Sequence, residues 1–228
     1  MIPWDKLPDD IKTDAVRPYY DALCKKEKSL AIKRTIDVFV SVFLLIILFP
    51  LLVGIAVWVS LGSKGGPFFC QQRVTTYGKK FTLFKFRTMV KDAPEKGTAV
   101  TGEKDDRVTE EGEFLRKYRL DELPQLINII AGDMSLVGTR PEVPKFVDKY
   151  TAEMKATLLL PAGVTSKASI EFKDEAEIIG DNTGDEADKI YVEKVLPEKM
   201  KYNLDYLEDY SVFNDIKLMF MTVIKVFK

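Results

Sequence analysis

The segment IDVFVSVFLLIILFPLLVGIAVWVSL, residues 36–61, is the most apolar stretch of the chain and decides the fold. Its only polar side chains are those of Asp37, Ser41 and Ser60. A run of about 20 such residues is long enough to cross a bilayer as a helix. Roughly 30 mostly polar residues precede it and no small-residue cleavage site follows, so a typical signal peptide does not fit. The sequence therefore predicts a membrane-inserted helix.

Three arrangements compete for this segment: a plain transmembrane span, a buried core helix, and a helix-break-helix that enters and leaves on one side of the membrane. A plain span carries its basic excess on one side only. Here both ends are flanked by basic residues, Lys25, Lys26, Lys28, Lys33 and Arg34 before it and Lys64, Arg73, Lys79, Lys80, Lys85 and Arg87 after it. Both flanks therefore have the character of cytoplasmic segments.

Pro50 lies in the middle of the apolar run. It cannot donate a hydrogen bond to the carbonyl of Ile46, so it kinks or breaks the helix there. The first arm, residues 36–49, rises about 21 Å, which is short of the roughly 30 Å hydrocarbon core. These features favour a re-entrant hairpin over a kinked span.

Asp37 is a carboxylate just inside the apolar segment. A charge there is costly unless it is paired, and Lys33 or Arg34 lies at helical spacing from it. The alternative is an interfacial residue that is simply hydrated, and the sequence does not separate the two.

The composition limits the chemistry. The 228 residues carry 34 basic and 35 acidic side chains, a net charge of −1 that gives no global preference for nucleic acid. There is no histidine, which excludes Ser-His-Asp and Cys-His catalysis and makes a zinc site improbable. Proton transfer then falls to carboxylates, or to a nucleophile that needs no base. Cys24 and Cys70 have no metal-ligand spacing and are interpreted as reduced thiols of a cytoplasmic protein.

After the apolar segment the pattern predicts a hairpin, with strands at Phe68–Val74 and Phe81–Met89 around a turn at Tyr77–Gly78. Lys85 and Arg87 share one face of the second strand. Taken alone, these two cations fit a solvated sheet face. A charged loop then extends over residues 91–107.

A short helix over residues 110–117 is predicted to begin at the N-cap Thr109. The next helix has apolar side chains at i, i+3, i+4 and i+7, namely Leu123, Leu126, Ile127 and Ile130. Gly132 suits its C-terminal end. Asp121 would then be its cap and Glu122 its first residue.

The acidic pair Asp121–Glu122 has two interpretations. Capping and the helix dipole alone favour carboxylates at a helix start. The surroundings favour an anion site instead, because Arg116 and its basic neighbours crowd this start and Arg140 lies in a loop after the helix. A carboxylate among such cations is explained by a magnesium ion or by a nucleophilic role.

Further along, residues 142–157 are predicted to be helical, residues 161–165 to form a loop, and residues 171–188 to be acidic, turn-rich and exposed. Helices are predicted around residues 190–207 and 212–227. The last one suits an interfacial amphipathic helix, although a helix packed on the domain core has the same pattern.

Several motifs occur in a fixed order, namely Lys33-Arg34-x-x-Asp37, Gln72-Arg73, Phe84-Lys85-Phe86-Arg87-Thr88-Met89, Asp106-Arg107, Arg119-Leu-Asp-Glu-Leu-Pro-Gln125 and Gly132-Asp-Met-Ser-Leu-Val-Gly-Thr-Arg-Pro141. From about Lys33 to the C-terminus the chain resembles the bacterial sugar transferase family, the monotopic polyprenyl-phosphate phosphoglycosyl transferases of glycan initiation.

The resemblance implies an enzyme that moves a sugar-1-phosphate from a UDP-sugar to polyprenyl (undecaprenyl) phosphate and releases UMP. Asp121 would be the nucleophile that forms a covalent phosphosugar, with Glu122 as its partner. Mg²⁺ would be held by Asp121 or Glu122. Phosphate contacts would come from four cations, Lys85, Arg87, Arg116 and Arg140.

The resemblance also implies a re-entrant membrane helix broken near Pro50, with Lys33, Arg34 and Asp37 as its anchor. The family often has Ser before this proline, whereas Phe49 stands here. The family's Arg-Pro-Gly-Ile-Thr-Gly loop is only partly matched over residues 160–169, so the donor sugar is not carried over.

We therefore expect a mostly helical α+β fold: an N-terminal arm (1–30), a re-entrant membrane helix (31–62), and a cytosolic catalytic domain (63–228) with a β-hairpin and amphipathic interfacial helices. The expected place is the bacterial inner membrane, with the catalytic domain on the cytoplasmic face. Expected partners are the UDP-sugar, polyprenyl phosphate and membrane lipid, without nucleic acid, and a homodimer is left open.

Two other classes compete with this interpretation. A nucleotide-sugar glycosyltransferase or a phosphatase usually has an Asp-x-Asp motif or a Walker loop, and the sequence has neither. A membrane-anchored scaffold would use Asp121 only as a helix cap.

Overall fold

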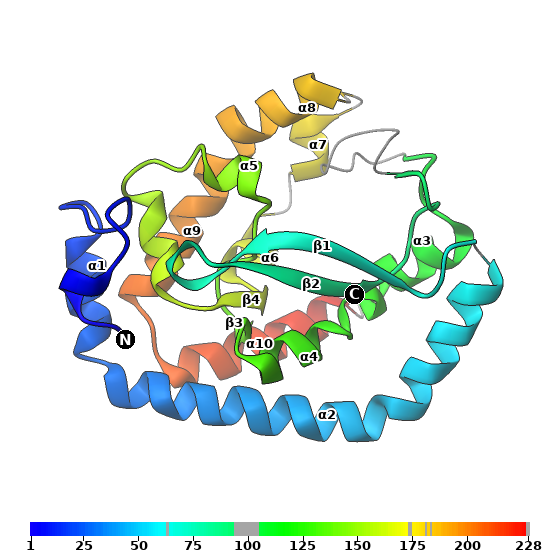
Figure 1. Ribbon diagram of the computed structural model, residues 1–228, viewed down its shortest axis with the longest axis horizontal. Helices are drawn as coiled ribbons and strands as arrows, with labels where there is room; N and C mark the ends of the chain where they lie inside the picture. The colour runs from blue at the N-terminus through cyan, green and yellow to red at the C-terminus, as the bar shows by residue number, and fades with distance from the viewer. Residues whose placement is uncertain (63, 94–104, 173–174, 181, 183, 227–228) are drawn as a thin grey trace.

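The computed structural model describes residues 1–62, 64–93, 105–172, 175–180, 182 and 184–226. Within these residues the chain is mostly helical, as the sequence predicts, and forms two small two-stranded sheets, of which only the hairpin was predicted. Its elements in chain order (Figure 1) are α1 (Arg17–Cys24), α2 (Glu27–Gly62), β1 (Phe68–Val74), β2 (Lys80–Phe86), α3 (Glu110–Lys117), α4 (Gln125–Ala131), β3 (Met134–Val137), α5 (Pro144–Val147), β4 (Ala162–Thr165), α6 (Lys167–Glu171), α7 (Glu175–Ile179), α8 (Gly184–Ile190), α9 (Leu196–Glu208) and α10 (Val212–Val226).

The apolar segment lies in α2, a long helix with two arms and a bend between them (Figure 1), and Pro50 lies inside it. Only 11% of its most apolar 18-residue window is buried, so the core-helix alternative does not fit. Arg34 in the first arm bonds to α4. In the second arm, Trp58 packs edge-on against Phe114 of α3, with ring centroids 5.7 Å apart. Both arms therefore contact the same folded body.

The predicted hairpin is present. β1 pairs antiparallel with β2, with Phe68 opposite Phe86, and the chain turns at Tyr77, whose φ of 56° is left-handed. β2 ends at Phe86 rather than at Met89. Phe81 and Leu83 are buried against α4, while Phe86 packs on the second arm of α2. One face of the hairpin is thus covered by α4, and the second arm of α2 covers the other face only at the Phe86 end, while Cys70 and Thr82 on that face stay exposed.

A second, parallel pair joins β3 and β4, so the loop prediction for residues 161–165 is wrong. Just beyond β3, the carbonyl of Thr139 accepts from the N–H of Gly163 at 2.8 Å. A Cβ on Gly163 would lie 2.2 Å from the backbone nitrogen of Gly138, so only glycine permits this approach. Four-residue strands are too short to show a clear alternation of apolar residues.

The helix predicted over residues 142–157 is also wrong. The structure has the single turn α5 and a 3₁₀ helix over Met154–Leu159. The hydroxyl of Thr151 accepts from the N–H of Met154 at 3.2 Å, so it caps a separate turn. Local capping here overrides the helical pattern of the segment.

The C-terminal helices are largely as predicted. Between α8 and α9 the backbone widens into a π-helical turn, Tyr191–Val195. Pro197 follows and has no N–H to bond the carbonyl of Glu193, which accounts for the wider turn. The acidic stretch contains α7 and α8 rather than turns alone, with residues 173, 174, 181 and 183 outside the described residues. The charged loop predicted after the hairpin falls partly on residues 94–104, which also lie outside them.

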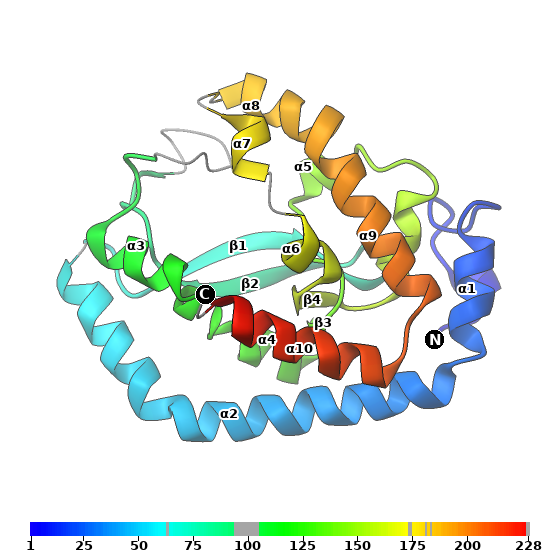
Figure 2. The same cartoon turned by 180° about the vertical axis from the view of Figure 1, so that it is seen from behind.

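The N-terminal arm packs into the main core. Leu7, Ile11 and Val16 are at most 3% exposed and lie in one cluster with Tyr206 and Leu207 of α9. α10 begins just after α9 and runs alongside the first arm of α2 (Figure 2). α2 therefore packs along the last helix of the described chain.

Candidate active site

Asp121 and Glu122 lie in a 3₁₀ turn, Leu120–Glu122, ahead of α4. The turn follows Arg119, whose φ of 53° is left-handed and aims the next residues inward. Both carboxylates are 7% exposed. α4 begins only at Gln125 without a side-chain cap bond, so the prediction that Asp121 caps this helix is wrong. Buried carboxylates that cap nothing need other partners.

The partners of Glu122 are two cations, Arg140 and Lys85. Arg140 donates to both of its oxygens, from Nη1 to Oε2 at 3.2 Å and from Nη2 to Oε1. Lys85 Nζ donates to Oε1 at 3.1 Å and lies 4.0 Å from Oδ2 of Asp121. The Arg140 pair is bidentate, the strongest form of such a contact. Glu122 is therefore fixed, while Asp121 is held more loosely.

The two carboxyl groups have opposite electrostatics. Burial raises the pKa of Asp121, against the nearby Lys85 cation. Burial also acts to raise the pKa of Glu122, but Arg140 and Lys85 together outweigh it and hold that pKa well below its usual range. Glu122 in turn raises the pKa of Arg140, and burial lowers the pKa of Lys85. Glu122 is thus the permanent anion of the pair, and Asp121 the one that titrates.

The other two predicted phosphate contacts differ in position. Arg116 on α3 donates from Nε to the hydroxyl of Thr88 at 2.9 Å; burial lowers its pKa, and Asp121 opposes that shift. Arg87 instead donates to the carbonyls of Lys64 and Phe68, at 3.2 and 3.1 Å. The structure therefore brings Lys85, Arg116 and Arg140 around the acidic pair and uses Arg87 at the link between α2 and β1.

A second charged layer lies behind Arg140, and most of its residues were not predicted from the sequence. Arg73 donates to the carbonyl of Pro141 at 3.0 Å. The buried Glu142 accepts from the hydroxyl of Tyr191, which accepts from Lys199 at 3.1 Å. Burial, and then Glu142, raises the pKa of Tyr191 well above its usual range. Tyr191 and Lys199 belong to no local motif, so only the fold reveals them.

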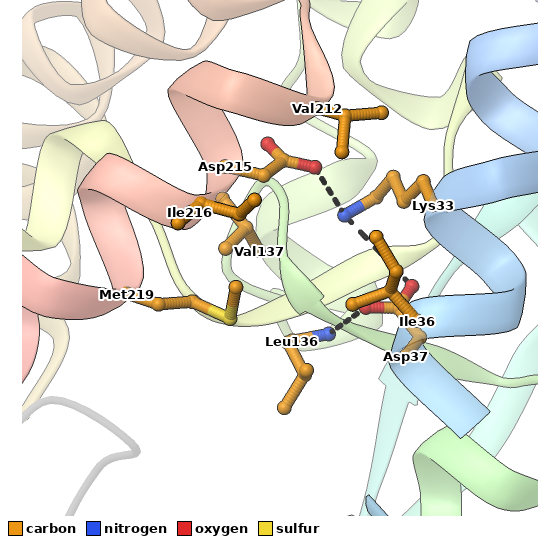
Figure 3. Close-up of a pocket in the computed structure, with 9 residues that line it drawn as sticks. All are labelled: Lys33, Ile36, Asp37, Leu136, Val137, Val212, Asp215, Ile216 and Met219. Atoms are coloured by element: carbon orange, nitrogen blue, oxygen red, sulfur yellow. Dashed lines mark hydrogen bonds and ion pairs between the residues drawn. The ribbon is translucent and has the colours of Figure 1, made fainter. Parts of the chain in front are cut away.

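Two of the predicted anchor residues, Lys33 and Asp37, form a separate cluster at the base of α2, that is, near its N-terminal end (Figure 3). Asp37 is 4% exposed and lies 3.8 Å from Lys33, so its predicted pairing with Lys33 is confirmed and the hydrated alternative is wrong. Lys33 makes a closer contact, 2.8 Å, with Asp215 of α10. Arg34 does not pair with Asp37 but donates to carbonyls of α4.

For a metal ion, the donor set is small. No group of three or more Cys, Asp or Glu side chains that could hold a metal occurs in the described part of the chain. Mg²⁺ commonly binds through one or two carboxylates together with substrate phosphates. Asp121 has the more open carboxylate for such a role, because both Glu122 oxygens are already bound to Arg140 or Lys85.

Comparison with known proteins gives a consistent family match. The family model for bacterial sugar transferases matches residues 28–228. The chain is 33% identical over 216 residues to the UDP-glucose:undecaprenyl-phosphate glucose-1-phosphate transferase of Escherichia coli, covering 93% of this chain and 43% of that protein. It is 40% identical over 130 residues to a putative undecaprenyl-phosphate N-acetylgalactosaminyl 1-phosphate transferase of Bacillus subtilis, covering 57% of this chain and 73% of that one.

The chain thus spans less than half of the Escherichia coli relative. The uncharacterised sugar transferase EpsL of Bacillus subtilis is closer to this chain in length. The two are 34% identical over 204 residues, which cover 86% of this chain and 88% of EpsL.

Proposed function

The chain belongs to the bacterial sugar transferase family, and from this premise we propose that it transfers a sugar-1-phosphate from a UDP-sugar to undecaprenyl phosphate and releases UMP. Relatives named for this reaction support the proposal. The observation that carries it is the buried Asp121–Glu122 pair among Lys85, Arg116 and Arg140. Three cations around two carboxylates suit a diphosphate substrate.

The reaction divides into two displacements at one phosphorus. An Asp121 carboxylate oxygen attacks the sugar-bearing phosphate, the bond to the bridging oxygen breaks, and UMP leaves with that oxygen. An oxygen of undecaprenyl phosphate then attacks the same phosphorus, and the bond to Asp121 breaks. The carboxylate is restored and the product is a sugar diphosphate lipid. The two steps need no net proton transfer, which suits a chain without histidine.

The two carboxylates divide the work by their surroundings. Both Glu122 oxygens are bound to Arg140 or Lys85, which leaves this residue poorly placed to attack phosphorus. Asp121 has the more open carboxylate and is the better nucleophile. Glu122 holds Lys85 and Arg140 where they can contact the donor phosphates, and Arg116 adds a third cation.

Mg²⁺ would be held by Asp121 together with the donor phosphates, because both Glu122 oxygens are already bound to Arg140 or Lys85. When bound, it would supply positive charge that offsets the charge of the diphosphate. The chain's own residues supply the nucleophile and the fixed cations.

The membrane arrangement follows from α2 and α10. We propose that α2 is re-entrant, because a straight 36-residue helix would separate its ends by about 54 Å, whereas both arms contact one body. α10 carries an exposed apolar face, Phe213, Ile216, Phe220, Val223 and Ile224. This face suits the lipid interface. The catalytic domain would then lie on the cytoplasmic face of the bacterial inner membrane, where UDP-sugars are found.

The proposal is tested by incubating the lipid-reconstituted protein with radiolabelled UDP-sugars and undecaprenyl phosphate. We expect UMP and a labelled lipid for at least one donor. Release of UDP would assign the protein to ordinary glycosyl transfer instead. Asp121→Asn should abolish UMP release, while a variant that kept full turnover would remove Asp121 from the chemistry.

A further inference from the structure

Side chains near the N-terminal end of α2 form hydrogen bonds to two elements of the candidate active site, α4 and β3. The guanidinium of Arg34 donates to the carbonyls of Ile129 and Ile130, at 2.6 and 3.1 Å. These carbonyls end α4, and α4 begins three residues after Glu122. A cation at a helix C-terminus stabilises the partial negative charge of the last carbonyls. Arg34 of α2 thus holds the C-terminal end of α4, the helix that follows the acidic pair.

The second bond concerns Asp37 and β3. One carboxylate oxygen of Asp37 accepts from the hydroxyl of Ser135 at 2.7 Å, and the other accepts from the N–H of Leu136 at 3.1 Å. Figure 3 shows the Asp37 carboxylate pointing to the backbone of Leu136. A carboxylate with both oxygens bonded inside the protein fixes the position of its donors.

The fixed strand leads directly to the active site. Arg140 follows Leu136 by four residues, and Gly138 between them is locked against β4, with its N–H donating to the carbonyl of Thr165 at 3.0 Å. Such a short and pinned segment has little slack. This segment is held by Asp37 on one side and by β4 on the other. Loss of the Asp37 bonds would loosen one of these two sides, and Arg140 at the end of the segment would then shift relative to Glu122.

The same cluster also includes Asp215, which is bonded to α9 and not to β3. Lys33 lies between Asp37 and Asp215, at 3.8 and 2.8 Å. Asp215 accepts from the hydroxyl of Tyr206 at 2.7 Å, so it links α10 to α9. Asp37 and Asp215 are similarly buried and share one lysine, but only Asp37 is bonded to β3. The pair therefore offers a matched comparison.

We propose that Asp37 is a positioning residue for phosphosugar transfer: from the base of the membrane helix, it holds β3 so that Arg140 meets Glu122. This inference rests on the proposed function. Asp37 would then affect the rate of the reaction through Arg140, in addition to anchoring α2. A displacement of about 1 Å at a reacting centre can cost up to a hundredfold in rate.

The test compares Asp37→Ala, Asp37→Asn and Ser135→Ala with Asp215→Ala, all reconstituted in the same lipid. For Asp37→Ala we expect kcat/KM to fall by about ten- to a hundredfold, with a higher KM for the UDP-sugar. Asp37→Asn keeps one acceptor for Leu136 and should fall less, and Ser135→Ala removes one bond without altering α2. Asp215→Ala should leave KM unchanged. Partial unfolding lowers Vmax without changing KM, so the rise in KM identifies a positioning effect.

A double-mutant cycle decides whether Asp37 acts through Arg140. In an Arg140→Lys background, Asp37→Ala should change kcat/KM by less than about twofold, because coupled residues are not additive. Full additivity, or equal effects of Asp37→Ala and Asp215→Ala on KM, would overturn the proposal.

Hydrogen exchange supplies a readout without turnover. Asp37→Ala should speed amide exchange in the peptide over residues 134–140 more than Asp215→Ala does. If the wild-type protein released no UMP, the proposed function would fail. The exchange comparison would still decide whether Asp37 holds the segment that carries Arg140, and equal exchange in the two variants would refute that role.

Discussion

At the scale of single residues, Asp121 and Glu122 are adjacent in sequence but sit in different electrostatic surroundings. Because burial raises the pKa of Asp121, its carboxylate is lost at a higher pH than that of an ordinary aspartate. We expect kcat/KM for UMP release to fall about tenfold per pH unit below this raised pKa. A pH profile between about pH 4 and pH 8 checks this. A rate that stays flat over that range would contradict the assignment of Asp121 as nucleophile.

The same contrast predicts opposite effects on stability. Glu122→Gln removes the permanent anion and leaves the partly buried cations Arg140 and Lys85 without it, so the free energy of unfolding should fall by about 1–3 kcal/mol. Asp121→Asn removes a charge that burial disfavours and should leave stability unchanged or slightly higher. Thermal melting of the two variants compares them directly. A lower melting temperature for Asp121→Asn than for Glu122→Gln would show that the two environments are assigned the wrong way round.

Part of the site could be predicted from the sequence. Asp121, Glu122 and Arg140 lie in compact motifs, and the structure brings them together with Lys85. The predicted capping role of Asp121 was wrong because Asp121 lies inside a 3₁₀ turn, and α4 begins only four residues later. Tyr191 could not be predicted as part of the site, because the Glu142 to which it bonds lies 49 positions away in the sequence.

At the scale of elements, the parallel pair of β3 and β4 depends on two glycines. Gly163→Ala would place a Cβ 2.2 Å from the backbone of Gly138, and a strain of this kind typically costs about 1–3 kcal/mol. We expect a lower melting temperature and reduced activity, because the pair positions Arg140. Gly54→Ala in α2 is the matched control, since nothing lies within 4 Å of its added Cβ. Equal melting of the two variants would refute the importance of the close approach.

The elements that were predicted well had strong local signals. Thr109 accepts from the N–H of Gly112 and starts α3 as expected. Gly132, at φ 94°, ends α4. β4 was missed because its pairing with β3 depends on a contact between distant segments. The helix expected after Glu142 failed because Thr151 starts a new turn within it.

At the scale of the whole molecule, the two native cysteines report on topology. Cys24 precedes α2 and Cys70 follows it, and both are exposed. If α2 is re-entrant, a membrane-impermeant maleimide added to intact cells should label neither thiol. Broken cells should show both labelled, and the single variants Cys24→Ser and Cys70→Ser identify each site. Labelling of one cysteine in intact cells would instead show that α2 crosses the membrane.

The bond between Lys33 and Asp215 joins residues 182 positions apart, which has a consequence for synthesis. At about 5–20 residues per second, a ribosome needs roughly ten to forty seconds to make the intervening chain. During that interval Lys33 and Asp37 stand at the start of an apolar helix without α10, and charges in that position resist passage through lipid. If α2 is re-entrant, Lys33 and Asp37 would therefore help to keep the nascent helix on the side of the membrane where it entered, before they bond to the rest of the protein.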